Sequence, residues 1–206
     1  MRSGTPPSLR RFVSLALAGI LMVVLAACTG RGGGYLPPQA PVFTGPASFG
    51  FDFSCERSSR STSTNPPTGQ LRIQLAYTDH GSNPIGSSFS IHGTVDQLDP
   101  VLESAICIGQ EPPPGGNELI FLGRYRLTTS APAGFPTACP TRETRTTPLC
   151  RFEVIVRDND QNLAPSPGDF FSIKLSTVTY VVSELPVTTV FYARAGYLAG
   201  GNLTVR

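Results

Sequence analysis

The sequence is poor in the residues that most catalytic sites require. It has no tryptophan and two histidines, and charged residues make up 15% of its 206 positions. The histidines, His80 and His92, belong to no H-E-x-x-H pair, and no G-x-S-x-G motif occurs. A Ser-His-Asp arrangement depends on the fold and stays open, since serines are plentiful. We therefore expect a protein that is not an enzyme, with a hydrolase as an alternative.

The chain also lacks an excess of charge of either sign. Its formal net charge is +2, and Arg2, Arg10 and Arg11 lie ahead of residue 28 with no acidic residue among them. The rest of the chain is therefore close to neutral. A neutral chain has no general attraction to phosphate backbones, so we expect no nucleic-acid partner.

Long hydrophobic runs are absent except for residues 12–27. This uncharged run follows basic residues and ends in small residues, which is the layout of an export signal. It is shorter than the about 20 residues of a membrane-spanning helix. Its end, Leu25-Ala26-Ala27-Cys28, resembles the lipobox of bacterial lipoproteins. In that family the cysteine thiol receives a diacylglycerol, the peptide is cut before the cysteine, and the new amino terminus is acylated.

The resemblance implies that residues 1–27 are a lipoprotein signal peptide and that Cys28 carries a membrane anchor. A transmembrane helix and an ordinary secretory signal are the alternatives, and the latter would leave Cys28 as an odd thiol. Several acyl chains anchor a protein stably. The expected location is the extracytoplasmic side of the cell envelope. Because Thr29 is not Asp, the resemblance also implies sorting to an outer membrane if the cell has one.

Four cysteines remain beyond Cys28, and an even number in an exported chain indicates two disulfides. Close pairs of the C-x₂-C type, which zinc sites use, do not occur. Three pairings are possible. Cys139 and Cys150 bracket a short segment that closes easily, which would leave Cys55 with Cys107.

Residues 28–47 are rich in glycine and proline, which is typical of a tether. From residue 48 onward, short runs alternate apolar and polar side chains and are separated by turn-forming residues. The runs are 49–55, 71–77, 89–95, 119–127, 152–156, 171–175, 190–197 and 203–205. No amphipathic helical stretch occurs in this part of the sequence.

The pattern predicts an all-β domain over residues 48–206, an antiparallel meander of about eight or nine strands. It forms either a barrel or a sandwich. The last strand, residues 201–205, is a candidate to pair with residues 49–53 and close a barrel. Short length and polar faces do not suit a membrane-spanning barrel.

Several pieces of residues 48–206 resemble the post-choice-of-anchor-P domain of bacterial extracytoplasmic proteins. They are residues 49–53 (FGFDF), 68–71 (TGQL), 77–81 (YTDHG), 152–159 (FEVIVRDN), 168–173 (GDFFSI) and 198–203 (LAGGNL). The resemblance implies an exported β-module without a settled activity. Residues 130–150 would be an insertion.

One loop carries the spacing of metal ligands. Asp158, Asp160 and Asn162 occupy positions 1, 3 and 5 of a twelve-residue segment that ends at Asp169, as in calcium-binding loops. Leu163 stands where such a loop needs glycine, and strands flank it in place of helices. A solvated hairpin loop is the competing interpretation, in which Asp and Asn bond backbone donors. Calcium is therefore the one candidate cofactor.

Taken together, the sequence predicts a lipid-anchored β-domain that acts by binding or scaffolding, with an envelope protein or polysaccharide as candidate partner. A barrel that carries a small apolar ligand is the alternative. Eight aromatic side chains could line such a cavity, although packing of a core is the interpretation that small barrels favour. They are Phe49, Phe51, Phe53, Phe89, Phe121, Tyr125, Phe152 and Phe171.

Overall fold

The computed structural model describes residues 28–57, 69–94, 117–137, 139, 149–159, 168–179 and 187–205. These residues form nine β-strands, and the all-β prediction is confirmed. The strands are β1 (Cys28–Leu36), β2 (Ala47–Arg57), β3 (Gly69–Asp79), β4 (Phe89–Thr94), β5 (Glu118–Leu127), β6 (Leu149–Arg157), β7 (Phe170–Thr179), β8 (Val187–Tyr197) and β9 (Gly200–Val205). Within these ranges there is no helix long and apolar enough to cross a membrane.

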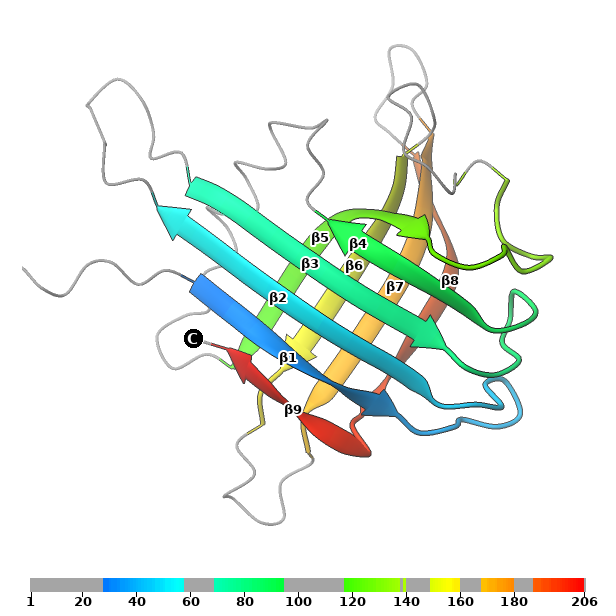
Figure 1. Ribbon diagram of the computed structural model, residues 1–206, viewed down its shortest axis with the longest axis horizontal. Coiled ribbons are helices and arrows are strands. Elements are labelled where there is room, and N and C mark those ends of the chain that lie inside the picture. Colours follow the sequence, from blue (N-terminus) through cyan, green and yellow to red (C-terminus); the bar gives the residue numbers. More distant parts are fainter. Residues whose placement is uncertain are drawn as a thin grey trace, which may run out of the picture.

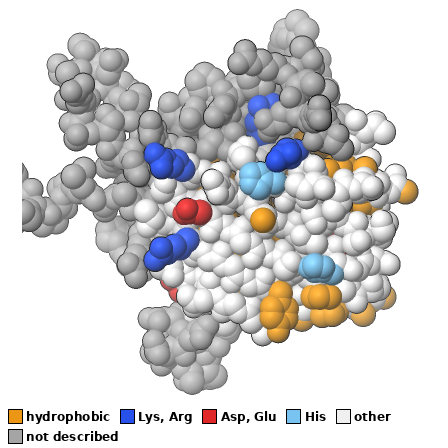
Figure 2. All heavy atoms as spheres, viewed as in Figure 1, with side chains coloured by type: hydrophobic (Ala, Val, Ile, Leu, Met, Phe, Trp, Pro, Cys, Tyr) orange, Lys and Arg blue, Asp and Glu red, His pale blue; other side chains and the backbone are white. Residues whose placement is uncertain are grey.

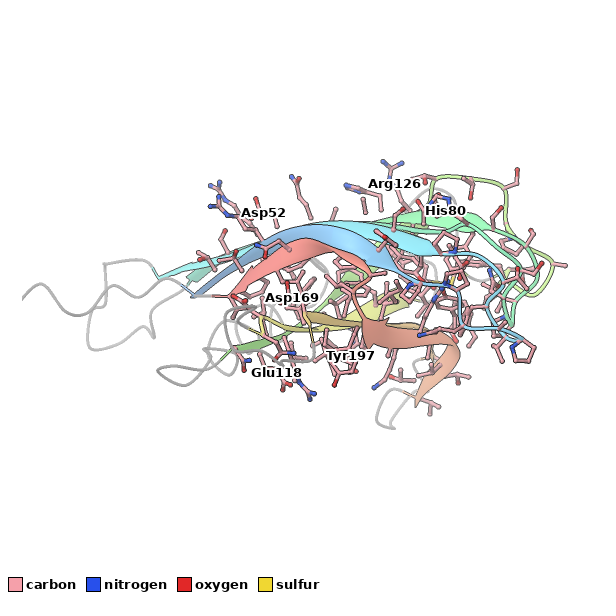
Figure 3. All side chains as sticks on the ribbon, turned by 90° about the horizontal axis from the view of Figure 1, so that it is seen from below. Asp52, His80, Glu118, Arg126, Asp169 and Tyr197 are labelled. Carbon is pink, nitrogen blue, oxygen red and sulfur yellow. A yellow bond between two sulfur atoms is a disulfide. The ribbon has the colours of Figure 1, made fainter. Side chains whose placement is uncertain are left out.

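All nine strands belong to one antiparallel sheet in the order β8-β7-β6-β5-β4-β3-β2-β1-β9 (Figure 1). The sheet curls into a half-barrel, so that β9 and β1–β4 lie over β6–β8 in two facing layers (Figure 3). Strand β5 joins the layers. Its residues Glu118–Arg124 pair with β6, whereas Arg124–Leu127 pair with β4. Barrel and sandwich were the two predicted forms, and the curled sheet combines features of both.

Gly123 is the residue that lets β5 pass between the layers. A Cβ atom at this position would collide with the carbonyl oxygen of Thr94 and the ring of Phe152. Glycine in a strand interior commonly marks such a bend, because it permits a close backbone approach. The curl of the sheet therefore depends on a residue without a side chain.

The core fills the space between the two layers with the inward residues of each strand. Strand β4 shows the period-two pattern directly, with alternate residues buried and half-buried. Phe49 of β2 stacks on Phe171 of β7 with ring centroids 3.7 Å apart, and Phe51 approaches Phe121 at 5.3 Å. All eight aromatic residues singled out from the sequence are buried. Each contributes about 1.5–3 kcal/mol by leaving water.

The prediction of a tether over residues 28–47 is wrong for residues 28–36. They form β1, which pairs with β2 on one side and β9 on the other. Its glycines serve close packing, since a Cβ on Gly30 would collide with Leu119 and one on Gly32 would lie 2.5 Å from the carbonyl oxygen of Asn202. Composition alone does not distinguish glycine used for flexibility from glycine used for close approach.

The position of β9 corrects a second expectation. It pairs with β1, with Gly30 opposite Val205, and not with residues 49–53. Residues 198 and 199 connect β8 to β9 across the open side of the half-barrel. The amide of Leu198 donates to the carbonyl of Asp169 at 2.8 Å, and that of Ala199 donates to the carbonyl of Tyr35 at 3.0 Å. This two-residue link ties the layers together at one end.

The structure contains a disulfide between Cys139 and Cys150, one of the two that the sequence predicts. Cys107 and the side chain of Cys55 lie outside the described residues, as do residues 1–27. The backbone register places Cys28 directly opposite Cys55.

Candidate functional site

The end of β3 supplies side chains to two neighbouring polar clusters. Tyr77 and Asp79 are buried, whereas Thr78 and His80 alternate with them and face outward. Figure 3 shows His80 on the outer surface of the upper layer. Because successive residues of a strand point to opposite faces, one short segment serves both the core and the surface.

The inner cluster is a buried ion pair between β3 and the edge strand β8. Arg194 Nη1 lies 3.1 Å from Asp79 Oδ2, and both side chains are 0% exposed. Tyr192 donates its hydroxyl to the same oxygen at 2.6 Å, and the amide of Gly81 donates to Asp79 Oδ1 at 3.2 Å. The carboxylate therefore receives hydrogen bonds at both oxygens, which offsets the cost of burying its charge.

Arg194 also fixes the segment between β1 and β2. Its Nη2 donates to the carbonyls of Pro37 at 2.9 Å and Gly45 at 2.8 Å. The guanidinium lies 4.6 Å from the ring centroid of Phe43, a cation–π distance. One side chain thus holds together β8, the end of β3 and the 37–46 connection.

Two tyrosines complete the inner cluster. The hydroxyls of Tyr77 and Tyr192 are 2.5 Å apart. Burial raises the pKa of both above the ordinary tyrosine value. Both hydroxyls therefore remain protonated donors at neutral pH. Since the protein's own groups occupy the polar atoms of Asp79, this cluster stabilises the fold and offers no nucleophile or base to a substrate.

The outer cluster borders a pocket with a cavity volume of about 430 Å³. Hydroxyl side chains dominate its lining, and His80 is the lining residue that can ionise. The lining consists of Thr78, His80, Ser87, Ser88, Phe89, Ser90, Thr129, Ser130 and Ala131. The pocket is therefore neutral and rich in groups that both donate and accept hydrogen bonds.

Hydrogen bonds hold several of these polar groups in place. Thr78 Oγ1 and Ser90 Oγ are 2.9 Å apart, and the amide of Ser90 donates to Thr129 Oγ1 at 3.0 Å. His80 Nε2 lies 2.8 Å from Ser48 Oγ on β2. The pocket wall therefore combines residues of β3, β4, the segments beside them and the segment after β5, and Ser48 of β2 supports it through His80.

The outer face beyond the pocket is polar and largely without large apolar groups (Figure 2). The register aligns Tyr35, Ser48, Thr78 and Ser90 in one row across β1–β4. The neighbouring row begins with Gly33, Gly50 and Ala76 and continues to His92 and Arg126. Figure 3 shows Asp52 and Arg126 projecting from this face.

The predicted calcium ligands are only partly described. Asp160 and Asn162 lie outside the described residues. Asp169 Oδ1 accepts a hydrogen bond from the amide of Asn159 at 3.1 Å, and its Oδ2 accepts one from the amide of Leu203 at 2.8 Å. Asp158 Oδ2 accepts the amide of Val205 at 3.1 Å. In the structure these two carboxylates bind the backbone of β9 to the opposite layer.

The described residues include no group of three His, Cys, Asp or Glu side chains that could hold a metal ion. His80 and His92 both lie on the outer face, as their positions in the sequence predict. Sequence reasoning missed Arg194 and the pocket hydroxyls. Arg194 shares a face with Tyr192 by alternation, which is a signal that it enters the core. The hydroxyls come from separate segments that no local pattern connects.

The chain matches no protein-family model, no curated protein and no solved structure. The resemblances drawn from the sequence therefore stay predictions.

Proposed function

We propose that the protein is a non-catalytic binding module, anchored to the cell envelope through lipid on Cys28, with the hydroxyl-lined pocket as its binding site. The observation that carries this proposal is that Cys28 and the pocket lie toward opposite ends of β1. Cys28 begins β1, whereas the pocket lies beside the row that includes Tyr35 near the other end of that strand. Seven residues of extended strand separate these positions by about 23 Å.

An anchor on Cys28 would therefore hold the pocket away from the bilayer. Because β1 begins at Cys28 and pairs with both neighbours, the folded domain would lie directly at the membrane surface without an intervening tether. The arrangement suits a site that faces ligands outside the membrane. With lipid on Cys28, the end of the sheet where β1 begins would meet the membrane.

A binding role fits the pocket better than catalysis. Apart from His80, the lining has no residue that can act as an acid or base at neutral pH. The buried carboxylate of Asp79 is bonded to Arg194 and Tyr192 and faces away from the pocket. The packed aromatic rings between the layers favour an outer binding surface over an internal cavity for an apolar ligand.

The anchor is tested by expressing the full chain in bacteria supplied with a palmitate analogue that can be labelled. We expect the parent to carry the label and to sediment with membranes, and Cys28→Ser to lose both properties. Thr29→Ala is the matched control and should behave as the parent. If Cys28→Ser sediments like the parent and the parent carries no label, the anchored module is excluded.

A further inference from the structure

Building on the proposed binding role, we infer that the pocket and the row that leads to it bind a neutral oligosaccharide. The pocket lining contains six serine and threonine hydroxyls and no acidic, lysine or arginine side chain. An ionic ligand would lose water there without gaining a counter-charge, which is unfavourable. The ligand should therefore be uncharged.

The hydroxyls of the pocket wall suit a ligand that itself carries hydroxyls. Every hydroxyl can donate and accept at the same atom, which is also true of sugar hydroxyls. Thr78 and Ser90 bond each other, and Ser48 bonds His80, so part of the wall is already oriented before a ligand arrives. Such preorganisation lowers the entropy cost of binding. A ligand with many hydroxyls matches this wall better than one with few polar atoms.

The row that leads to the pocket is long enough for more than one sugar ring. Tyr35 is 45% exposed and lies in the same cross-strand row as Ser48, Thr78 and Ser90. The row spans three strand spacings, about 14 Å, which exceeds one sugar ring. The Tyr35 ring lies over Gly200, which has no side chain to cover it. A pyranose ring can place its apolar face on this tyrosine, which presents an apolar body and a polar tip.

The neighbouring row, which begins with Gly33, Gly50 and Ala76, leaves space beside Tyr35 and Ser48 for an extended saccharide. Gly33 and Gly50 carry no side chains and Ala76 a small one, and the register places the three side by side. An extended ligand can therefore lie along the row from Tyr35 to the pocket without displacing protein groups. This geometry favours a linear oligosaccharide over a monosaccharide.

The test uses the full lipidated chain, purified in detergent and applied to an array of linear neutral hexose oligosaccharides, the corresponding monosaccharides and uronic-acid analogues. We expect binding to neutral oligosaccharides that changes by less than about twofold between low and high salt, because no ion pair contributes. Thr78→Ala combined with Ser90→Ala should weaken binding by about tenfold or more, the effect of one or two lost hydrogen bonds.

Two further variants locate the ligand. Tyr35→Ala should weaken binding of the oligosaccharides more than that of the monosaccharides. Ser54→Ala, on the same outer face but four positions after Gly50 along β2, is the matched control and should bind like the parent. Thermal melting of each variant establishes that it is folded.

The proposal is overturned if only uronic-acid ligands bind, if binding falls steeply with salt, or if the pocket variants bind like the parent. It is also overturned if no saccharide binds while the anchor on Cys28 is demonstrated, a result that leaves the anchored module standing. If the purified parent chain binds saccharide but its Cys28 carries no lipid, the saccharide inference is supported and the proposed lipid anchor is rejected.

Discussion

Tyr77 and Asp79 point into the core from β3, whereas Thr78 and His80, which alternate with them, point to the pocket. The inner pair belongs to a cluster with two full charges and no exposure. The outer pair belongs to a cluster of neutral hydroxyls with access to solvent. The end of β3 thus places a charged side chain, Asp79, in the dry interior and the hydroxyl of Thr78 toward the surface, the reverse of the usual distribution.

The difference shows how stability and recognition are separated within a few residues. A buried ion pair is sensitive to the loss of either partner, because the remaining charge is left without compensation. Exposed hydroxyls exchange bonds with water at little cost. We therefore expect changes in the inner cluster to unfold the domain and changes in the outer cluster to alter binding.

The largest effect is expected for Asp79→Asn, which leaves the buried Arg194 without its counter-charge. The free energy of unfolding should fall by about 3–5 kcal/mol. Urea titration monitored by circular dichroism measures it. The matched control is Glu153→Gln, which breaks the solvent-exposed pair with Lys174 and should cost at most about 1 kcal/mol. Equal losses in the two variants would contradict the distinction between the inner cluster and the surface.

Alkaline pH should destabilise the fold through its buried tyrosines, two of which belong to the inner cluster. Burial raises the pKa of Tyr77, Tyr125 and Tyr192, so above about pH 10 the unfolded chain releases protons that the folded chain keeps. The free energy of unfolding then falls as pH rises, by about 1.4 kcal/mol per pH unit for each such tyrosine. Urea titrations between pH 9 and about pH 11 measure this slope.

Tyr125→Phe provides the matched variant, because burial is the one cause of the raised pKa at this residue. Its slope should be smaller than that of the parent by about 1.4 kcal/mol per pH unit. An unchanged slope would mean that Tyr125 is not protonated in the folded protein at high pH.

A smaller effect is expected for Asp169→Asn. This buried carboxylate accepts two backbone amides but, unlike Asp79, pairs with no arginine in the described contacts. Losing one of these bonds should cost about 1–3 kcal/mol. A loss as large as that of Asp79→Asn would show that the ion pair is not what makes the inner cluster sensitive.

The effect of calcium on the melting temperature tests the loop of residues 158–169, which ends at Asp169. Since both oxygens of Asp169 already accept backbone amides, we expect calcium to leave the melting temperature of the full chain unchanged relative to chelator. A rise with calcium that disappears in Asp160→Ala would instead establish the metal site that the ligand spacing suggests.

The smallest effect on stability is expected in the pocket. Ser88→Ala removes an exposed hydroxyl and should change the free energy of unfolding by less than about 0.5 kcal/mol. Oligosaccharide binding should weaken in the same variant. A large loss of stability would place Ser88 with the residues that hold the fold.

Much of the fold follows from local pattern. Alternation along residues such as 71–77 identifies strands and their inner faces, and the aromatic core is readable from it. The role of residues 28–36 cannot be read from local pattern. Their glycines are explained by contacts with Leu119 and Asn202, which are distant in sequence. The pairing of β9 with β1 is likewise a long-range contact that no local signal specifies.

The candidate site was less predictable than the fold. His80 could be found as a polar residue in a turn, yet its bond to Ser48 depends on the β2–β3 register. Arg194 looks like a surface residue by type, and only its place on the face of Tyr192 indicates burial. Chemistry assembled from several strands becomes visible once their register is known.

The pairing of β1 with β9 has a consequence for how the chain reaches its native state. Gly30 must meet Val205, so the sheet is completed by contacts between segments made at very different times during synthesis. Until β9 arrives, β1 offers a free edge to any other extended chain. Contacts of such long range slow folding and prolong exposure of that edge. The early part of the chain would therefore depend on protection from aggregation until β9 has been made.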